Sequence, residues 1–294
     1  MNDKSFTLIE IMVVIVIIGI ISSFIYPSTT RVRNQTSLTK IQLFSQKLNN
    51  SLAENIIGQW LFNEKSGAIV YDNSGNGNNG TIYGSAAWET SSKNCVFDFC
   101  LNFDGVDDYV GVSKDLTNGL TSLTAGVWVK GSRASNILCS ANNAIILHFR
   151  GAGFYLVAED GTASNYLSWS TTLPYNEWLY LVATWSSPAV GGDGKMKLYV
   201  NGVKESGELA FAGGTTGRLK SGNPLNIGKY FNDYQPWFLG KMDDISIYDR
   251  VSSVSQIRQN YYLGLNNLFI NREISKVEYQ QKIAAIERFI ANGE

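Results

Sequence analysis

The sequence is poor in cysteine, proline and net charge, and each shortage excludes something. Its 294 residues include three cysteines and five prolines, and the formal net charge is −1. Three cysteines are too few for a disulfide scaffold. A charge so close to zero gives no indication of a nucleic-acid partner or of binding to an acidic surface.

Glycine and the large aromatic residues are abundant instead. There are 28 glycines, 15 tyrosines and 7 tryptophans, a composition typical of a β-rich body with many tight turns. The length accommodates one membrane segment and one domain of roughly 200 residues with a substantial core.

The N-terminal segment is strongly hydrophobic. From Phe6 to Tyr26 it has about the 20 residues that a helix needs to cross a bilayer. Glu10 lies inside this run, where a carboxylate costs about 2.5–3.5 kcal/mol. A secretory signal peptide would have a shorter apolar stretch and a small-residue cleavage site, for which Tyr26-Pro27-Ser28 is a poor candidate. A plain membrane anchor fits the length but leaves Glu10 unexplained.

The first ten residues carry a specific motif. Met1–Ser5 is a short polar leader, and Phe6-Thr7-Leu8-Ile9-Glu10 opens the apolar run. This pattern resembles the N termini of type IV pilins and of the related pseudopilins of type II secretion. The resemblance implies that prepilin peptidase cleaves between Ser5 and Phe6 and that Phe6 is N-methylated. Glycine usually precedes the cut in that family, whereas Ser5 stands there in this chain.

The resemblance also gives Glu10 a role in assembly. A buried carboxylate needs a counter-charge, and the new Phe6 amine of a neighbouring subunit supplies one. Because only one stagger of the two helices places amine beside carboxylate, the pairing sets the axial register between subunits.

The first helix is expected to extend beyond the membrane segment, over residues 6–57. An apolar stripe at spacings of three, four or seven residues continues past Pro27; its members are Leu38, Ile41, Leu48, Leu52 and Ile56. Such a helix would be on the order of 70 Å long, with its second half under the head domain. The alternative is that residues 28–56 form only a linker.

The pattern changes to strands in residues 58–250. Ala125–Gly131, Lys195–Glu205 and Asp243–Asp249 alternate between apolar and polar residues, and Asn201-Gly202 is a strong signal for a two-residue hairpin turn. Many short strands separated by turns predict an antiparallel sandwich or jelly roll.

Six segments of this region resemble the laminin-G-like branch of the concanavalin A-like jelly rolls. They are Gly58–Gly84, Cys100–Val112, Ser122–Lys130, Asn176–Trp185, Lys197–Val203 and Phe238–Arg250, and they follow one another in the family's order. The resemblance implies a mainly β, jelly-roll head. It does not fix a function, because this fold serves lectins, adhesins, glycoside hydrolases and structural modules.

No residue pattern points to catalysis. Glycoside hydrolases on this fold carry paired carboxylates along one strand, and no Glu-x-Asp-x-x-Glu run is present. The pairs Asp107-Asp108 and Asp243-Asp244 are adjacent residues, which point to opposite faces of a strand. His148, the only histidine, is expected to be structural, and Cys139 to be a buried thiol. The chain is therefore not expected to be an enzyme.

The loop Asp72–Asn79 is rich in side chains whose oxygen atoms can coordinate calcium. Asp72, Ser74 and Asn76 stand at positions 1, 3 and 5 of an EF-hand-like pattern, but position 12 is Tyr83 rather than glutamate, which rejects an EF-hand. A different structural Ca²⁺ site stays open. The alternative is an Asx-turn, in which Asp72 only binds backbone amides.

The jelly-roll resemblance nominates the missing carboxylate of such a site. In these jelly rolls the final strand lies next to the first, so Asp243 or Asp244 would complete the calcium ligands. Cys95 and Cys100 lie close together in the sequence, and export to an oxidising compartment favours a disulfide between them over two free thiols.

Residues 251–294 return to helical spacing. One stripe is Ile257, Tyr261, Leu265 and Leu268, and a second is Tyr279, Ile283, Ile286 and Ile290. Ser275 and Glu278 have the spacing of a capping box. The tail is expected to form a helical hairpin packed on the jelly roll, and the alternative is a docking surface for another subunit.

Together these features predict a type IV pilin-like or pseudopilin subunit. It would assemble with other pilins through residues 6–57 after removal of residues 1–5, and it would display its head outside the cytoplasmic membrane. Adhesion to glycans or to a surface receptor is the expected role of the head. The alternatives are a membrane-anchored carbohydrate-binding module and a structural major pilin.

Overall fold

The computed structural model describes residues 55–131, 135–149, 153–162, 164–168, 173–174, 176–222, 224–231 and 237–291. The predicted leader, Phe6, Glu10 and the membrane segment lie outside the described residues. Within the part of the chain that is described, no helix is both long and apolar enough to cross a membrane.

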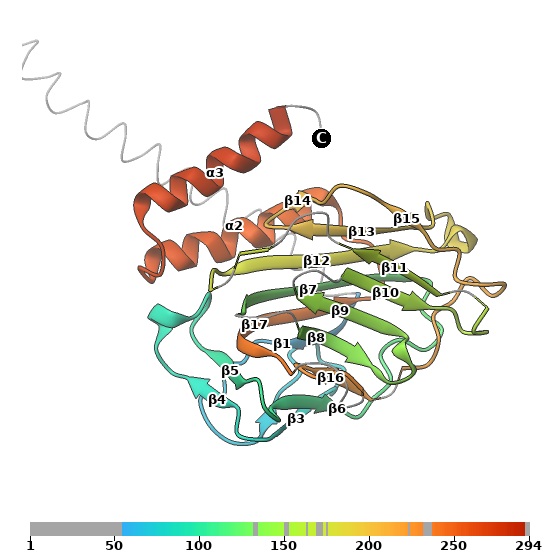
Figure 1. The fold of residues 1–294 in the computed structure, drawn as a ribbon, viewed down its shortest axis with the longest axis horizontal. Coiled ribbons are helices and arrows are strands. Elements are labelled where there is room, and N and C mark those ends of the chain that lie inside the picture. Colours follow the sequence, from blue (N-terminus) through green and yellow to red (C-terminus); the bar gives the residue numbers. More distant parts are fainter. Residues whose placement is uncertain are drawn as a thin grey trace, which may run out of the picture. The chain divides into compact units, whose positions relative to one another are not determined.

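The described residues form a sandwich of two antiparallel sheets (Figure 1). In the described part of the chain, sheet A has nine strands: β1 (Ile56–Trp60), β4 (Ala87–Glu89), β5 (Cys100–Asp104), β7 (Ser122–Gly131), β12 (Leu179–Ser186), β13 (Lys195–Val200), β14 (Val203–Lys204), β15 (Leu209–Ala210) and β17 (Leu239–Tyr248). The main path runs β14-β13-β12-β7-β17-β5-β4, with β1 on β17 and β15 on β13.

Sheet B, counted over the same described residues, has eight strands: β2 (Ile69–Val70), β3 (Gly80–Tyr83), β6 (Tyr109–Val112), β8 (Ser135–Ser140), β9 (Ile145–Phe149), β10 (Gly153–Val157), β11 (Ser164–Ser168) and β16 (Leu225–Ile227). They are ordered β11-β10-β9-β8-β16-β6-β3-β2. Three short 3-10 helices lie in connections, at Ser92–Asn94, Ala141–Asn143 and Pro188–Val190.

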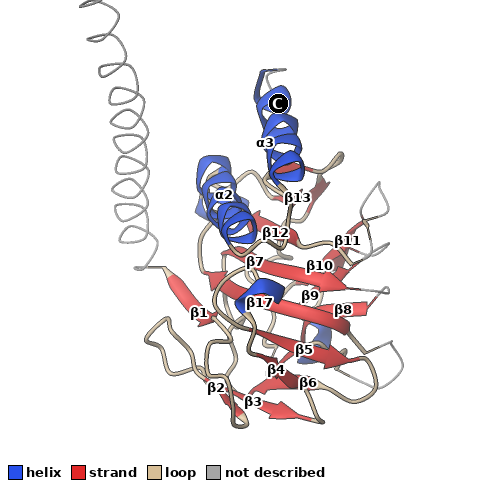
Figure 2. Cartoon of the chain, turned by 90° about the vertical axis from the view of Figure 1, so that its left-hand side faces the viewer, coloured by secondary structure: helices blue, strands red, loops and turns tan. Residues whose placement is uncertain are grey.

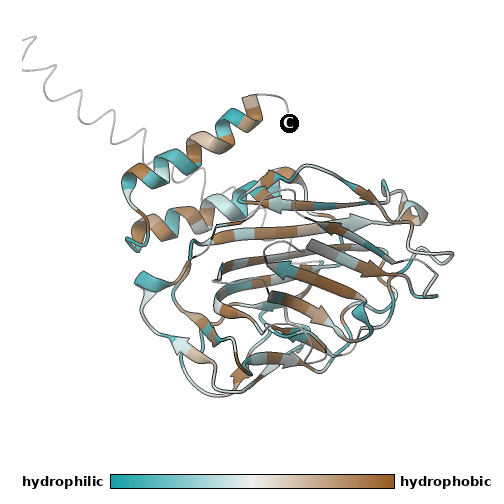
Figure 3. Cartoon of the chain, viewed as in Figure 1, coloured by the Kyte–Doolittle hydropathy of each residue, from teal (hydrophilic) through white to brown (hydrophobic). Residues whose placement is uncertain are grey.

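Strand alternation builds the core between the sheets. Successive side chains of a strand point to opposite faces, and the apolar set of each sheet meets that of the other in one buried cluster. Its largest fully buried members include Trp60, Phe62, Phe103, Trp185 and Phe211. The hydropathy colouring shows hydrophobic stretches along β9 and β12 (Figure 3).

Two helices form a third layer on the outer face of sheet A. They are α2 (Val254–Ile270) and α3 (Lys276–Ala291), and Figure 2 shows them together at the end of the molecule away from β2, β3 and β6. The predicted stripe of α2 is buried as a whole, whereas α3 buries only Ile286. Ile290, the last member of the second predicted stripe, is 47% exposed, because α3 is the outermost layer.

The close approach of α2 depends on Gly264. A Cβ at this position would overlap the indole ring of Trp128 on β7, and that ring stacks on Tyr180 and Tyr261. Ser253 closes α2 at its N terminus with a full capping box to Gln256. Ser275 accepts a hydrogen bond from the Glu278 amide at the start of α3, which is one half of the predicted box.

The architecture agrees with the mainly β, jelly-roll-like fold and the helical tail expected from the sequence. The Asn201-Gly202 turn joins β13 to β14 with positive φ at both residues, as a two-residue hairpin requires. One boundary differs, since Ile56 and Ile57, expected to end the first helix, belong to β1. The main-chain partner of Ile56 is Tyr248 on β17.

Candidate binding surface

The Asp72 loop is held by the Asp72 carboxylate itself. Its Oδ1 accepts from the amides of Gln59 and Ser74, and its Oδ2 accepts from the Asn78 amide and the Ser74 hydroxyl. Burial opposes ionisation of Asp72, but these hydrogen bonds outweigh it and hold the pKa of the carboxyl below its ordinary value. This is the geometry expected of an Asx-turn loop.

The same loop also hydrogen-bonds to the main chain of β1. The side-chain amides of Asn76 and Asn78 donate to the carbonyls of Ile56 and Ile57, at 2.9 and 2.5 Å, and the Asn73 amide donates to the Gln59 carbonyl. One edge of β1 pairs with β17, and no described strand pairs with its other edge. The asparagine side chains hydrogen-bond to main-chain carbonyls of β1 that a further strand would otherwise bind. The loop thus replaces a neighbouring strand.

The two aspartates nominated for calcium turn away from each other. Asp243 Oδ2 accepts from the amides of Val96 and Phe97, whereas Asp244 Oδ1 accepts from the Gln59 side chain and Ser246. Burial raises the pKa of Asp244 to about 6 and raises that of Asp243 well above its ordinary value.

Asp72, Asp243 and Asp244 each accept hydrogen bonds from a different set of protein groups. Asp72 already uses both oxygens on hydrogen-bond donors, and Asp243 faces the loop between the two cysteines. The expected neighbourhood of first and last strands is nevertheless present, because β1 pairs with β17 and Gln59 bonds to both Asp72 and Asp244. The geometry favours the Asx-turn alternative, and calcium binding stays a prediction.

Cys95 and Cys100 form a disulfide, as predicted. Both are buried in the cluster that contains Trp128 and the apolar side of α2. Cys139 is the free, buried thiol that was expected, and burial raises its pKa to about 12. It is therefore inert as a nucleophile.

The outer face of sheet B carries a surface that the sequence analysis did not assemble. Cross-strand partners point to the same face of a sheet, and one unbroken line of partners crosses the eight described strands of sheet B. The line is Ile69, Thr81, Gly111, Asn226, Cys139, Ile146, Tyr155 and Tyr166.

An aromatic cluster, here called cluster 1, stands at the β3 and β6 end of this line. Tyr83 and Tyr109 are stacked with their ring centroids 4.6 Å apart, and Trp237 lies 5.9 Å from Tyr109. The Lys229 ammonium lies 4.7 and 4.5 Å from the centroids of Tyr109 and Trp237. Tyr83 is 48% exposed, so the cluster is open to a ligand.

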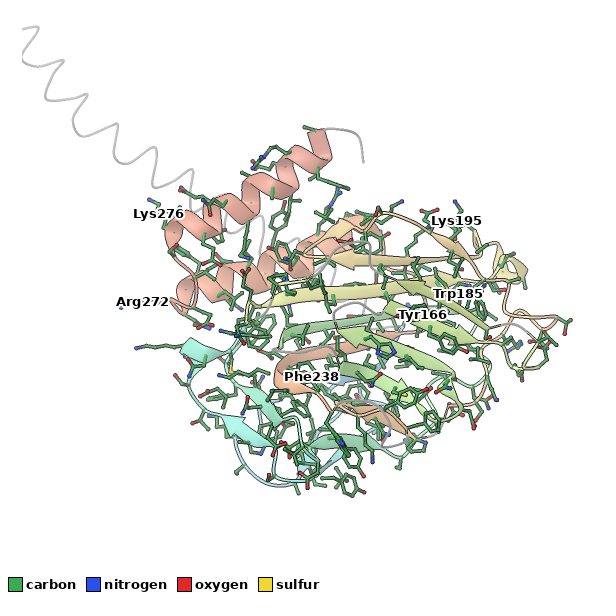
Figure 4. All side chains as sticks on the ribbon, viewed as in Figure 1. Tyr166, Trp185, Lys195, Phe238, Arg272 and Lys276 are labelled. Atoms are coloured by element: carbon green, nitrogen blue, oxygen red, sulfur yellow. A yellow bond between two sulfur atoms is a disulfide. The ribbon has the colours of Figure 1, made fainter. Side chains whose placement is uncertain are left out.

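A second group, cluster 2, stands at the β10 and β11 end. Tyr166 is 43% exposed and lies 6.4 Å from Tyr155 and 6.5 Å from His148, measured between ring centroids. Tyr166 is labelled in Figure 4. Burial lowers the pKa of His148 to about 4, so its imidazole is neutral at pH 7.

An acidic group borders cluster 1. Asp104, Asp107 and Asp108 have carboxylate oxygens within 4.8 Å of one another, and Asp108 directly precedes Tyr109. Asp108 is buried and accepts from the amides of Ser85 and Asp104, whereas Asp107 is exposed. The adjacent pair occupies different environments, but both residues lie in the connection between β5 and β6 and not in a strand, so strand alternation does not apply to them.

Sequence reasoning missed most of this surface. The missed residues are four tyrosines on four different strands, and each points to the face opposite the apolar core residues of its strand. They are Tyr83, Tyr109, Tyr155 and Tyr166. The alternation shows that they share a strand face with polar residues, but nothing local shows that the strands are neighbours.

Comparison with protein families gives two matches. Residues 1–26 match the prokaryotic N-terminal methylation motif, the motif of type IV pilins. Residues 104–258, more than half of the chain, match the family described as the concanavalin A-like lectin/glucanases superfamily. Comparison with curated protein sequences gives no match.

Several solved structures share the fold. The binding domain of Paraclostridial Mosquitocidal Protein 1 is 14% identical with a TM-score of 0.58, over 73% of this chain and 53% of that one. The botulinum neurotoxin serotype G binding domain is 13% identical, with a TM-score of 0.54 over 72% and 51%. The receptor binding domain of the botulinum neurotoxin C/D mosaic serotype is 17% identical, with 0.53 over 71% and 51%. Each similarity thus spans about half of the other chain.

Proposed function

Because this chain belongs to the concanavalin A-like lectin/glucanases superfamily and begins with a prokaryotic N-terminal methylation motif, we propose that it is a minor, adhesive type IV pilin-like subunit. Its N-terminal helix assembles with other pilins, and its head binds glycans at a surface. One observation carries the proposal: an aromatic surface is left open on the head of a chain that begins with an assembly motif.

The chemistry of cluster 1 supports glycan binding. A sugar ring has an apolar face of C–H groups and a rim of hydroxyls, so it packs on an aromatic ring and bonds to polar groups beside it. Tyr83 and Trp237 supply rings, the Lys229 ammonium lies over the Tyr109 and Trp237 rings, and Asp107 is an exposed acidic residue two positions before Tyr109. Tyrosine and tryptophan also lose little conformational freedom on binding.

The proposed domain organisation follows the sequence. Residues 1–5 are removed by prepilin peptidase, residues from 6 to the start of β1 form the membrane and assembly helix, and the rest is the head with its helical tail. Before assembly the chain spans the cytoplasmic membrane once, and afterwards the head is exposed at the cell or pilus surface.

The amount of this protein in filaments and in membranes distinguishes the proposed function from two others. A structural major pilin would dominate sheared filaments, and a membrane-anchored carbohydrate-binding module would stay with the membrane. A minor adhesive pilin would be a scarce component of the filaments. Quantitative mass spectrometry of sheared filaments and membranes distinguishes the three, and the same spectra must show methylated Phe6 as the first residue.

Glu10 gives the direct test of assembly. Glu10→Gln keeps the shape but removes the charge, so the neighbour's Phe6 amine loses its partner and incorporation should fall roughly tenfold or more. Membrane insertion and processing should persist, because a neutral side chain is cheaper in the bilayer and Ser5 is unchanged. Glu10→Asp, which keeps the charge, is the matched control and should retain more incorporation. Full incorporation of Glu10→Gln would refute the assembly role.

The proposal includes no catalytic step and no required metal. Hydrolysis of any glycan that the purified chain binds would overturn the first expectation. Calcium remains a separate prediction, tested by comparing melting temperatures in excess Ca²⁺ and in chelator; equal values favour the Asx-turn alternative.

A further inference from the structure

The turn between α2 and α3 presents two aliphatic side chains to solvent. Ile270 is 64% exposed and Val277 is 62% exposed, and of the large hydrophobic residues that the structure describes only Val106 is more exposed. Phe269 and Tyr279, whose ring centroids lie 5.0 Å apart, bring the end of α2 against the start of α3. Ile270 directly follows Phe269, and Val277 lies two residues before Tyr279, so both exposed side chains occupy one end of the helical layer.

Two exposed basic residues stand in the same turn. Arg272 and Lys276 lie at the edge of the molecule in Figure 4, and neither forms an ion pair with any described residue. The neighbouring acids Glu273 and Glu278 are each paired with a lysine from another position. The turn therefore combines exposed aliphatic side chains with two positive charges that lack acidic partners in the part of the chain that is described.

A cavity of about 300 Å³ lies beside the turn, between α2, α3 and the connection that leads into β12. That volume is at the lower end of the range for small-molecule sites. Three carboxylates against two ammonium groups give its charged lining a net charge of −1, opposite in sign to Arg272 and Lys276. The charged lining consists of Lys130, Lys282, Glu177, Glu273 and Glu278.

Two groups in the lining lack full partners. Lys282 lies 3.4 Å from Glu177 and 3.7 Å from Glu278, so one ammonium serves two carboxylates at long distances. The indole N–H of Trp178, a residue that is 5% exposed and lines the cavity, has no acceptor among the described residues. Buried polar groups normally have partners. A ligand with an ammonium group and an acceptor oxygen supplies what these groups lack.

We propose that the α2–α3 turn and its cavity bind the headgroup of a phosphatidylethanolamine-type lipid at a membrane surface. The phosphate lies at Arg272 and Lys276, since guanidinium and ammonium groups bind phosphate through charge-assisted hydrogen bonds. The primary ammonium enters the acidic cavity, and Ile270 and Val277 contact the acyl region. The inference rests on the membrane anchor proposed above and not on glycan binding.

Charge and hydrogen bonding select this headgroup. A phosphatidylglycerol headgroup brings no cation to the three carboxylates of the cavity. A choline headgroup brings a cation but has no N–H to donate to them. A primary ammonium does both, and the cavity is large enough for the headgroup but not for an acyl chain.

The position of the turn in the chain also suits a lipid. The turn lies beyond residues 104–258, which match the superfamily, so the site belongs to the helical tail. Residues 1–26 match the methylation motif of type IV pilins, and a chain anchored by them has its head close to the bilayer. Anchoring raises the effective concentration of lipid at the head, so a site that is weak for free lipid is occupied in the membrane.

The test is amide hydrogen exchange of the full-length protein in nanodiscs of three compositions with the same acyl chains. One is phosphatidylcholine alone, and the others replace half of it with phosphatidylethanolamine or with phosphatidylglycerol. Mass spectrometry follows peptides that cover residues 268–282. Exchange there should be about tenfold slower with phosphatidylethanolamine than with phosphatidylcholine alone, because the bound headgroup holds the turn closed. Phosphatidylglycerol should slow it less.

Charge variants separate the two halves of the site. The double variant Arg272→Gln with Lys276→Gln removes the phosphate contacts and should exchange in all three nanodiscs as it does in phosphatidylcholine. Glu177→Gln removes one acceptor for the ammonium and should lose most of the phosphatidylethanolamine effect. The matched controls on α3 are Arg288→Gln and Glu287→Gln, which should behave as the unmodified protein does. Thermal unfolding of each variant confirms that the head is folded.

Equal exchange in the three nanodiscs overturns the lipid site. Slowing by phosphatidylglycerol as large as that by phosphatidylethanolamine, or a Glu177→Gln variant identical to the unmodified protein, overturns the ammonium assignment. Slowing that occurs in detergent and grows with protein concentration identifies a second copy of the chain as the occupant and overturns the proposal. Failure of the protein to insert into any nanodisc overturns the membrane anchor and with it this inference, whereas none of these outcomes bears on glycan binding.

Discussion

The outer faces of the two sheets both carry stacked aromatic pairs, but one pair is covered by a helix and the other is exposed. On sheet A, Trp128 and Tyr180 are cross-strand partners whose rings stack, and α2 covers them with Tyr261. On sheet B, Tyr83 and Tyr109 are cross-strand partners whose rings stack, and Tyr83 stays 48% exposed. Aromatic pairs on a strand face are therefore either core or open surface, depending on what the rest of the chain lays over them.

The difference has consequences for energy. A covered ring contributes its full buried area to folding, whereas an open ring contributes little to folding and keeps its area for a ligand. Substitutions on sheet A should accordingly act on stability, and substitutions on sheet B should act on binding. The same comparison identifies α2 as the element that converts one face into core.

The largest effect is expected at Trp128. Replacement by alanine removes a ring that is 1% exposed and packed on both Tyr180 and Tyr261, so the free energy of unfolding should fall by about 3–5 kcal/mol. Urea denaturation measures it. If the loss were as small as that of Tyr83→Ala, the covered face would not be part of the core.

Gly264→Ala should give the next largest loss of stability, although alanine has a higher helix propensity than glycine. In an open helix this change stabilises by about 1 kcal/mol, but here the new Cβ overlaps the Trp128 ring, which its stacking partners hold in place. A net loss of about 1–3 kcal/mol is expected. The double variant with Trp128→Phe should recover part of it, because the smaller ring leaves room. Strict additivity of the two losses would show that the helix does not rest on this ring.

The partly buried acid Asp244 should give a smaller, pH-dependent effect. Burial raises its pKa from 3.8 to about 6, so between these values the folded state holds a proton that the unfolded state releases. Wild-type stability contributed by this group therefore falls as pH rises from about 4 to 6 and is level above. Asp244→Asn cannot ionise, so its stability relative to wild type should rise over that window by about 1–2 kcal/mol.

Asp115 is the control of opposite sign. Burial opposes its ionisation, but hydrogen bonds from Ser221, Thr117, Gly222 and Asn118 hold the pKa of Asp115 below its ordinary value. Asp115→Asn should therefore be most destabilising at neutral pH, with the difference shrinking as pH falls through the acidic range. Parallel pH profiles for the two variants would contradict both assignments.

The smallest effect on stability is expected at Tyr83. Since its ring is half exposed on the open face, Tyr83→Ala should change the unfolding free energy by less than about 1 kcal/mol. Differential scanning calorimetry measures this change. A loss comparable to that of Trp128→Ala would mean that cluster 1 belongs to the core and not to a binding surface.

Local patterns in the sequence determined several features of this protein. The alternation of β13, the Asn201-Gly202 turn and the buried stripe of α2 are set by residues a few positions apart. The pairing of Cys95 with Cys100 is similarly local. The methylation motif also stands in consecutive residues. Such features need only the backbone's own periodicity and short-range contacts.

Tertiary structure alone decided where those elements meet. Tyr83, Tyr109, Tyr155 and Tyr166 come from four strands, and Trp237 comes from the approach to a fifth; only the strand order of sheet B places them along one line. Likewise, Asp243 accepts a hydrogen bond from the loop between the two cysteines, more than a hundred residues away in the sequence. Asp72 accepts one from the Gln59 amide of β1, thirteen residues away. Alternation states which residues share a face of one strand. It carries no information on which strands are neighbours or which face a helix will cover, because cross-strand register and layer packing are set by contacts between distant parts of the chain.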